Sequence, residues 1–172
     1  MALQPSFCTL RESEKRKKLG VRKSLSNPDD LAGIIIRLNS LSENSPRKWG
    51  RMTVAQMLKH CEKTLQVGMG KIVLPKTPYV IRLIGICAKK EIRLFDNGIP
   101  RNMPTYKALK LKESCKFEEA KESFLISLNE FLVALNENTL IPHHQLFGKM
   151  NNEDWGFLQY KHLDHHLKQF ET

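Results

Sequence analysis

The feature that most constrains this chain is an unbroken apolar stripe across residues 117–135. Large apolar side chains recur there every three or four positions, which is the spacing that places them on one face of an α-helix. Asn136 and Asn138 mark its end. A helix with so wide an apolar face must bury it against other helices, so the segment predicts a helical core. The stripe consists of Phe117, Ala120, Phe124, Leu125, Leu128, Phe131, Leu132 and Leu135.

Three other segments have the marks of amphipathic helices. One begins at Asn27-Pro28, where Asn caps and Pro suits the first helical position, and its apolar residues run from Leu31 to Leu41. The second begins at Thr53, which forms a capping box with Gln56, and ends near Gly68. The last begins at residues 151–154 and runs to about residue 170. Four such helices in 172 residues predict an all-α fold, a four-helix bundle.

Two stretches between these helices are harder to assign. Residues 75–95 are rich in Ile and Val; a short helix packed on the core is favoured there, and a strand is the alternative. Residues 96–111, with Gly98, Pro100 and Pro104, predict a long irregular connection, and residues 142–150 predict a loop.

The basic residues are concentrated near the N-terminus. Residues 11–23 contain seven Lys or Arg and two Glu, so this segment supplies half of the net charge of +10. Residues 1–26 are therefore predicted to be a flexible basic arm, and residues 27–172 to be the four-helix-bundle domain. The arm lacks interleaved aromatic residues and any known nucleic-acid-binding module, so a solvated tail is favoured over nucleic-acid binding.

The cysteines and the apolar stretches indicate in which cellular compartment the protein is expected. Cys8, Cys61, Cys87 and Cys115 are widely spaced, which predicts free thiols in a reducing compartment. Residues 1–10 do not resemble a secretory signal, and the most apolar window, residues 79–88, is about half the length that crosses a bilayer. These patterns predict a soluble, cytoplasmic protein with no membrane partner.

The candidate chemistry lies with the histidines of the last predicted helix. His162 and His166 are four residues apart and fall on the buried face, so both imidazoles can reach one metal ion. The alternative is that both are core histidines satisfied by hydrogen bonds. His165 falls at the edge of this face and Asp164 opposite it, so neither is expected to be a ligand. His60 lies off the apolar stripe of its own helix, and spacing alone makes it a boundary residue.

Three motifs resemble those of a known family, the DinB-like (YfiT-like) metalloenzymes, including a subfamily of domains of unknown function. The motifs are residues 49–60 (WGRMTVAQMLKH), residues 160–170 (YKHLDHHLKQF), and residues 147–150 (FGKM) followed by Trp155-Gly156. The resemblance covers about residues 27–170. It implies a four-helix bundle, often a homodimer, in which His60, His162 and His166 hold a divalent metal ion such as Zn, Ni or Fe.

The resemblance also implies a class of reaction. The characterised relatives are transferases and isomerases that use low-molecular-weight thiols, so a metal-dependent thiol transferase acting on a small molecule is the first hypothesis. A non-catalytic metal-binding or stress-related assembly protein is the alternative, because no general acid or base stands out. Glu62 is expected to be solvated and Cys61 to belong to the core.

Three more residues are candidates for supporting roles. Gln159 and Gln169 share the histidine face and are expected to hydrogen-bond the metal-binding imidazoles. His144 occupies the place of a family loop motif, but here Gln145 and Leu146 replace its Pro and first Phe. His144 is therefore either a residue that lines the site or a hydrogen-bonded histidine of the loop.

Overall fold

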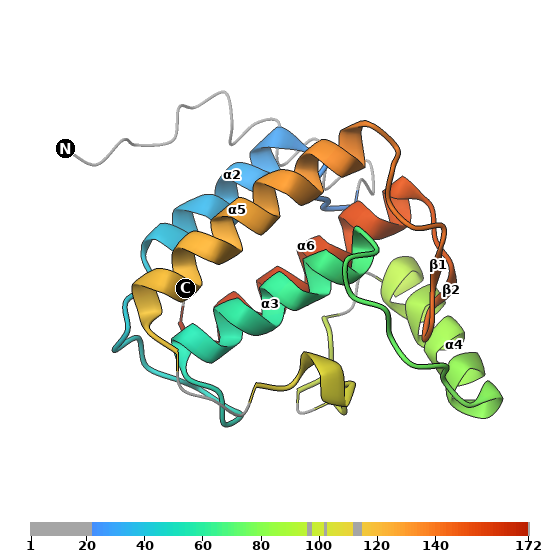
Figure 1. The fold of residues 1–172 in the computed structure, drawn as a ribbon, viewed down its shortest axis with the longest axis horizontal. Coiled ribbons are helices and arrows are strands. Elements are labelled where there is room, and N and C mark those ends of the chain that lie inside the picture. The colour runs from blue at the N-terminus through green and yellow to red at the C-terminus, as the bar shows by residue number, and fades with distance from the viewer. Residues whose placement is uncertain (1–21, 96–97, 102, 112–114, 172) are drawn as a thin grey trace.

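The computed structural model of the protein describes residues 22–171 apart from 96–97, 102 and 112–114, and this part is mostly helical. The prediction of an all-α fold is confirmed, with one short two-stranded hairpin beside the helices (Figure 1). The elements are α2 (Pro28–Asn39), α3 (Val54–Gly68), α4 (Tyr79–Phe95), η1 (Lys107–Leu109), α5 (Phe117–Asn136), β1 (His143–His144), β2 (Gly148–Lys149) and α6 (Asn152–Gln169).

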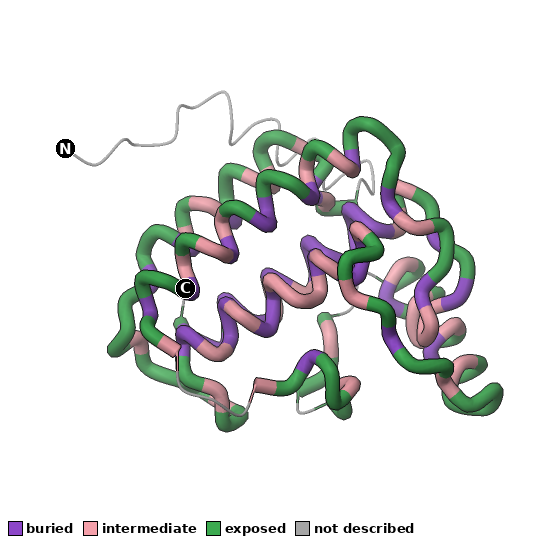
Figure 2. The backbone as a smooth tube through the Cα atoms, viewed as in Figure 1, coloured by how far each residue is buried: buried purple, intermediate pink, exposed green. Residues whose placement is uncertain are grey.

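Helices α2, α3, α5 and α6 lie side by side and enclose the core. Helix α3 packs against α5 and α6, and α6 also packs against α2 and α5. Their apolar faces point inward, so that buried and exposed residues alternate along each helix in Figure 2. The largest fully buried side chains include Ile34, Met57, Leu58, Leu65, Phe124, Leu128, Phe131, Trp155, Leu163, Leu167 and Phe170.

The predicted helix starts are confirmed by their caps. The side chain of Asn27 accepts a hydrogen bond from the amide of Asp30 at 3.1 Å. Thr53 and Gln56 form the expected reciprocal capping box, with bonds of 3.2 and 3.0 Å. At α6 the cap is Asn151, which accepts from the Asp154 amide at 2.8 Å. These bonds satisfy amide groups that have no partner inside the helix.

Helix α4 confirms the favoured assignment of residues 75–95 but lies in an unexpected place. It does not pack on the core; it lies at one end of the molecule and contacts β2 (Figure 1). Gly85 and Ile92 are its buried residues. The hairpin β1–β2 forms within the predicted loop 142–150, and η1 interrupts the predicted irregular connection.

The described end of the predicted basic arm is packed against the domain. Leu25 is 1% exposed and belongs to the core, and its amide donates to the carbonyl oxygen of Gly156 at 3.1 Å. A Cβ at Gly156 would lie 2.5 Å from Ser24 Oγ, so this glycine lets the segment approach α6. Ser24 and Leu25 therefore pack against the helices. Residues 1–21 lie outside the described part, and for them the division into arm and domain stays a prediction.

Two findings bear on the predicted location. No helix in the described part of the chain is long and apolar enough to cross a membrane. Cys61, Cys87 and Cys115 are free thiols, and Cys8 lies outside the described residues. A cytoplasmic location stays a prediction.

Candidate metal site

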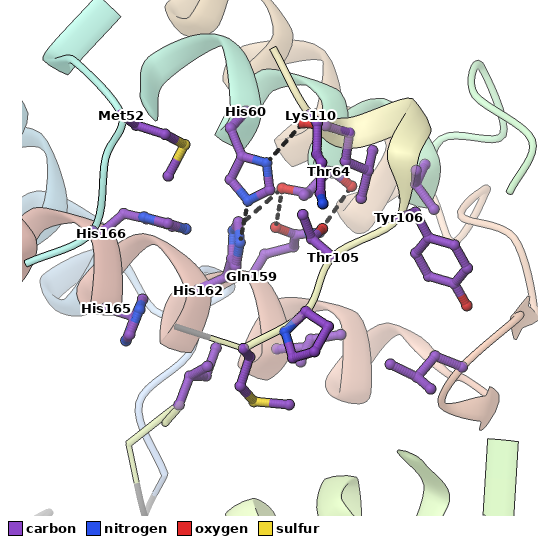
Figure 3. Close-up of a pocket in the computed structure, with 18 of the residues that line it drawn as sticks. Met52, His60, Thr64, Thr105, Tyr106, Lys110, Gln159, His162, His165 and His166 are labelled. Carbon is purple, nitrogen blue, oxygen red and sulfur yellow. Dashed lines mark hydrogen bonds between the residues drawn. The ribbon is translucent and has the colours of Figure 1, made fainter. Parts of the chain in front are cut away.

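Helices α3 and α6 bring together the three histidines that the family resemblance implies. His60 comes from α3, and His162 and His166 lie one turn apart on α6. One ring nitrogen of each lies within 4.8 Å of the others, so the group could hold a metal ion. Figure 3 shows the three imidazoles pointing toward one another, with His165 turned aside.

His60 is buried, although its position on the helix predicts a boundary residue. It is 6% exposed because the segment around η1 covers this side of α3. Its Nδ1 lies 3.1 Å from the carbonyl oxygen of Leu109. A carbonyl can only accept, so Nδ1 carries the proton and the Nε2 lone pair faces the other histidines.

Thr64 determines which nitrogen of His162 carries a proton. The Thr64 hydroxyl lies 2.8 Å from the Cys61 carbonyl oxygen, to which it donates its one proton. Its oxygen therefore accepts from His162 Nδ1, 3.3 Å away. Gln159 does not contact the imidazole of His162 but holds Thr64 instead. Its side-chain amide donates to the Thr64 carbonyl oxygen at 3.0 Å. The expected contact between Gln159 and an imidazole is thus replaced by a contact through Thr64.

Gln169 orients His166 directly, as expected. His166 Nδ1 lies 2.9 Å from Gln169 Oε1, and Gln169 Nε2 donates to the Trp49 carbonyl at 2.7 Å. The second bond fixes the amide orientation, so the oxygen faces His166 and Nδ1 of that ring donates. Gly50 makes room for this arrangement: it has φ +80°, and a Cβ there would lie 2.5 Å from Gln169 Nε2.

These hydrogen bonds leave all three Nε2 atoms without a proton. His60 Nε2 and His162 Nε2 lie 3.2 Å apart, so two lone pairs face each other at hydrogen-bond distance. Two imidazole nitrogens bound to one tetrahedral zinc, at about 2.0–2.1 Å each, lie roughly 3.3 Å apart. The donor set and its spacing therefore fit a shared divalent cation.

Protonation of one of the imidazoles would relieve the repulsion between the facing Nε2 lone pairs, but it is unfavourable here. Burial lowers the pKa of His60, and burial together with the neighbouring imidazoles holds the pKa of His162 well below its usual value. Burial lowers the pKa of His166 to about 3. The three rings are therefore neutral near pH 7, which is the state that coordinates metal.

The triad opens onto a cavity of about 600 Å³ between α3, α6, the hairpin loop and the segment around η1. Apolar side chains dominate its wall. The charged residues of its lining are Arg51 and Lys110, and no Asp, Glu or Cys is among the described residues that line it. The cavity suits a small molecule with an apolar body and a negative charge.

His144 combines both roles weighed from the sequence. It lines the cavity, and its Nδ1 accepts hydrogen bonds from the amides of Leu146 and Phe147 at 3.0 and 3.3 Å. Burial lowers the pKa of His144 to about 4. His144 is therefore a neutral, hydrogen-bonded loop histidine that faces the cavity.

Two residues weighed for catalysis lie away from the triad. The expectation that Glu62 is solvated is wrong, because its side chain is 12% exposed and accepts from Lys59 Nζ and Ser123 Oγ, each at 2.9 Å, between α3 and α5. Cys61 is fully buried, and burial raises the pKa of its thiol. It belongs to the core, as expected. Sequence reasoning missed Thr64, although it follows His60 by four residues and so shares its face of α3.

Comparison with known proteins supports one family assignment. A family model described as "Protein of unknown function (DUF1569)" matches residues 21–172, which is most of the chain. No curated protein and no solved structure matches the chain. The match includes all three histidines and begins just before the segment that packs on α6. The chain therefore belongs to the DUF1569 family of proteins of unknown function.

Proposed function

We propose that His60, His162 and His166 bind one divalent metal ion, Zn, Ni or Fe, through their Nε2 atoms. The observation that carries this proposal is the 3.2 Å approach of two unprotonated nitrogens, each held by a hydrogen bond on the opposite side of its ring. We also infer that the helices form a DinB-like four-helix bundle, because the histidines come from the two helices that the resemblance implies.

We propose further that the site handles a small anionic thiol. Three protein ligands leave a position open toward the cavity, as in catalytic metal sites. A divalent cation held there would lower the pKa of a thiol that reaches it and would favour the thiolate. Arg51 and Lys110 provide the only charges in the described lining and attract an anionic molecule. A metal-dependent thiol transferase fits these features.

One observation favours a second candidate, a metal-binding or assembly protein without catalysis. The described lining of the cavity contains no carboxylate or thiol, so outside the triad its imidazoles, His144 and His165, are left for general acid or base catalysis. In that case the metal would stabilise the packing of α3 on α6, and no molecule that enters the cavity would bind to it.

Cobalt substitution separates the two candidates. Protein loaded with Co²⁺ should show ligand-field absorption, and N-acetylcysteine should add a thiolate-to-cobalt charge-transfer band. N-acetylserine, which has a hydroxyl in place of the thiol, should add none. The His60→Ala variant should lose the ligand-field absorption at the same cobalt concentration.

Two negative results of the cobalt experiment would reject different parts of the proposal. A cobalt spectrum that N-acetylcysteine leaves unchanged would reject the thiol proposal and favour the second candidate. Absence of any cobalt spectrum in the wild-type protein would reject the metal site itself.

A further inference from the structure

Helix α4 has its apolar side turned to solvent. Seven large apolar side chains on it are between 51% and 79% exposed, which is unusual for one short helix. Figure 2 shows α4 projecting from one end of the molecule with mostly exposed residues. We call this the α4 face. Its exposed residues are Tyr79, Val80, Ile81, Leu83, Ile84, Leu94 and Phe95, together with Cys87.

Three of the four basic residues of α4 face the protein and fix this orientation, while Lys90 is exposed. Arg82 donates to His143 Nε2 at 2.6 Å, and Lys89 pairs with Asp154 at 3.3 Å. Arg93 pairs with Asp154 as well as with Glu153. The buried Gly85 lies against Leu146, where a Cβ would come within 2.6 Å of that residue. The helix is therefore held with Arg82, Lys89 and Arg93 inward and its apolar side outward, where Lys90 and Glu91 are also exposed.

We propose that the α4 face binds the same face of a second copy of the chain, with the two helices antiparallel. Aromatic side chains alone bury about 150–250 Å² each when covered. The whole face then offers on the order of 800 Å², which is what a stable interface takes from each partner. Val80, Cys87 and Leu94 are spaced by seven, which gives a straight seam for helices that cross at a shallow angle.

The register follows from two-fold symmetry. Cys87 is the middle residue of Tyr79–Phe95 and lies at the centre of the exposed arc of the helix. Around an axis at Cys87, Val80 of one copy meets Leu94 of the other, and Tyr79 meets Phe95. Each Cys87 meets its own counterpart, because a residue on the axis of such an interface contacts itself.

A lipid surface fits the same face less well. An interfacial helix presents Lys and Arg beside its apolar side, where they reach anionic headgroups. In α4 the side chains of Arg82, Lys89 and Arg93 are committed to partners on the protein itself, which leaves Lys90 as the one exposed basic side chain of this helix. The dimer proposal requires no metal, so it stands apart from the proposed function.

Light scattering and oxidation of the full-length protein test the proposal. Wild-type protein at micromolar concentration should have the mass of a dimer, and Ile84→Glu should make it a monomer. The matched control is Ile126→Glu, which changes an isoleucine on α5 that is 57% exposed and should leave a dimer. Diamide should link wild-type chains covalently, and Cys87→Ser should abolish the link even though Cys8 and Cys115 remain.

Three outcomes would overturn the proposal. One is a wild-type monomer at these concentrations. Another is a dimer that survives Ile84→Glu with its helical circular dichroism intact. The third is a wild-type monomer that sediments with vesicles of anionic phospholipid, which would assign the face to a membrane surface.

Discussion

Each imidazole of the triad is oriented by a different kind of partner. His60 donates to the Leu109 carbonyl, His162 to the Thr64 hydroxyl, and His166 to the Gln169 amide oxygen. Such partners set the tautomer of a metal-binding histidine and increase its basicity. The three contacts make distinct predictions, because the Thr64 and Gln169 side chains can be changed without touching a proposed ligand.

Thr64→Val should weaken metal binding while leaving the fold intact. Valine has nearly the same shape but accepts no hydrogen bond, so His162 loses the contact that keeps Nε2 unprotonated. Loss of such a partner lowers metal affinity by about 10–100-fold. Competition with a chromophoric chelator measures the affinity. Thr64→Ser, which keeps the hydroxyl, should bind like wild type, and equal affinity in Thr64→Val would contradict the assigned tautomer.

Gly50→Ala should disturb the site through Gln169. The added Cβ would lie 2.5 Å from Gln169 Nε2, and φ of +80° is strained for alanine. We expect lower metal affinity together with a loss of about 1–3 kcal/mol in the free energy of unfolding.

Gly33→Ala is the matched control for this change. A Cβ at Gly33 on α2 meets nothing within 4 Å, and alanine there should stabilise the helix by roughly 0.5–1 kcal/mol. Denaturant unfolding gives both values. If the Gly50 variant kept wild-type stability and affinity, Gly50 would have no part in orienting Gln169.

At the scale of helices, the sequence predicted what local patterns determine. Apolar spacing and caps placed α2, α3, α5 and α6, because those signals lie within each helix. Spacing also placed His162 and His166 on one buried face. It failed for His60, whose burial depends on the distant segment around η1. Spacing also failed for α4, where Lys89 and Arg93 find partners on α6 and the apolar side faces outward.

The segment before α2 should be essential to stability as far as Leu25. This side chain is 1% exposed, and truncating a buried leucine to alanine costs about 2–5 kcal/mol. Leu25→Ala should therefore lower the melting temperature by several degrees. Ile36→Ala, on α2 at 70% exposure, should change it little. Equal melting temperatures for Leu25→Ala and wild type would show that residues 22–26 do not belong to the folded domain.

At the scale of the whole molecule, buried neutral histidines make stability depend on pH. The pKa of His144 is about 4 and that of His166 about 3, against 6.5 in an unfolded chain. Between these values the unfolded chain binds more protons, so the free energy of unfolding falls as the pH drops below 6.5. Each such residue adds a slope of up to about 1.4 kcal/mol per pH unit.

Metal-free protein unfolded by urea at several pH values between 6.5 and 5 tests this expectation. The His144→Gln variant should show a shallower slope than wild type, because it loses one of the groups that titrate. Carboxylates are common to both proteins and cancel in the comparison. Identical slopes would mean that His144 has the same pKa in the folded protein as in the unfolded chain.

The most direct test of the metal site is the metal content of protein purified without a histidine tag. Elemental analysis should find about one divalent ion per wild-type chain, and far less in His60→Ala, His162→Ala and His166→Ala. His165→Ala should keep its metal, because that ring lies outside the group of three. Equal metal content in the wild type and the three triad variants would contradict the shared site.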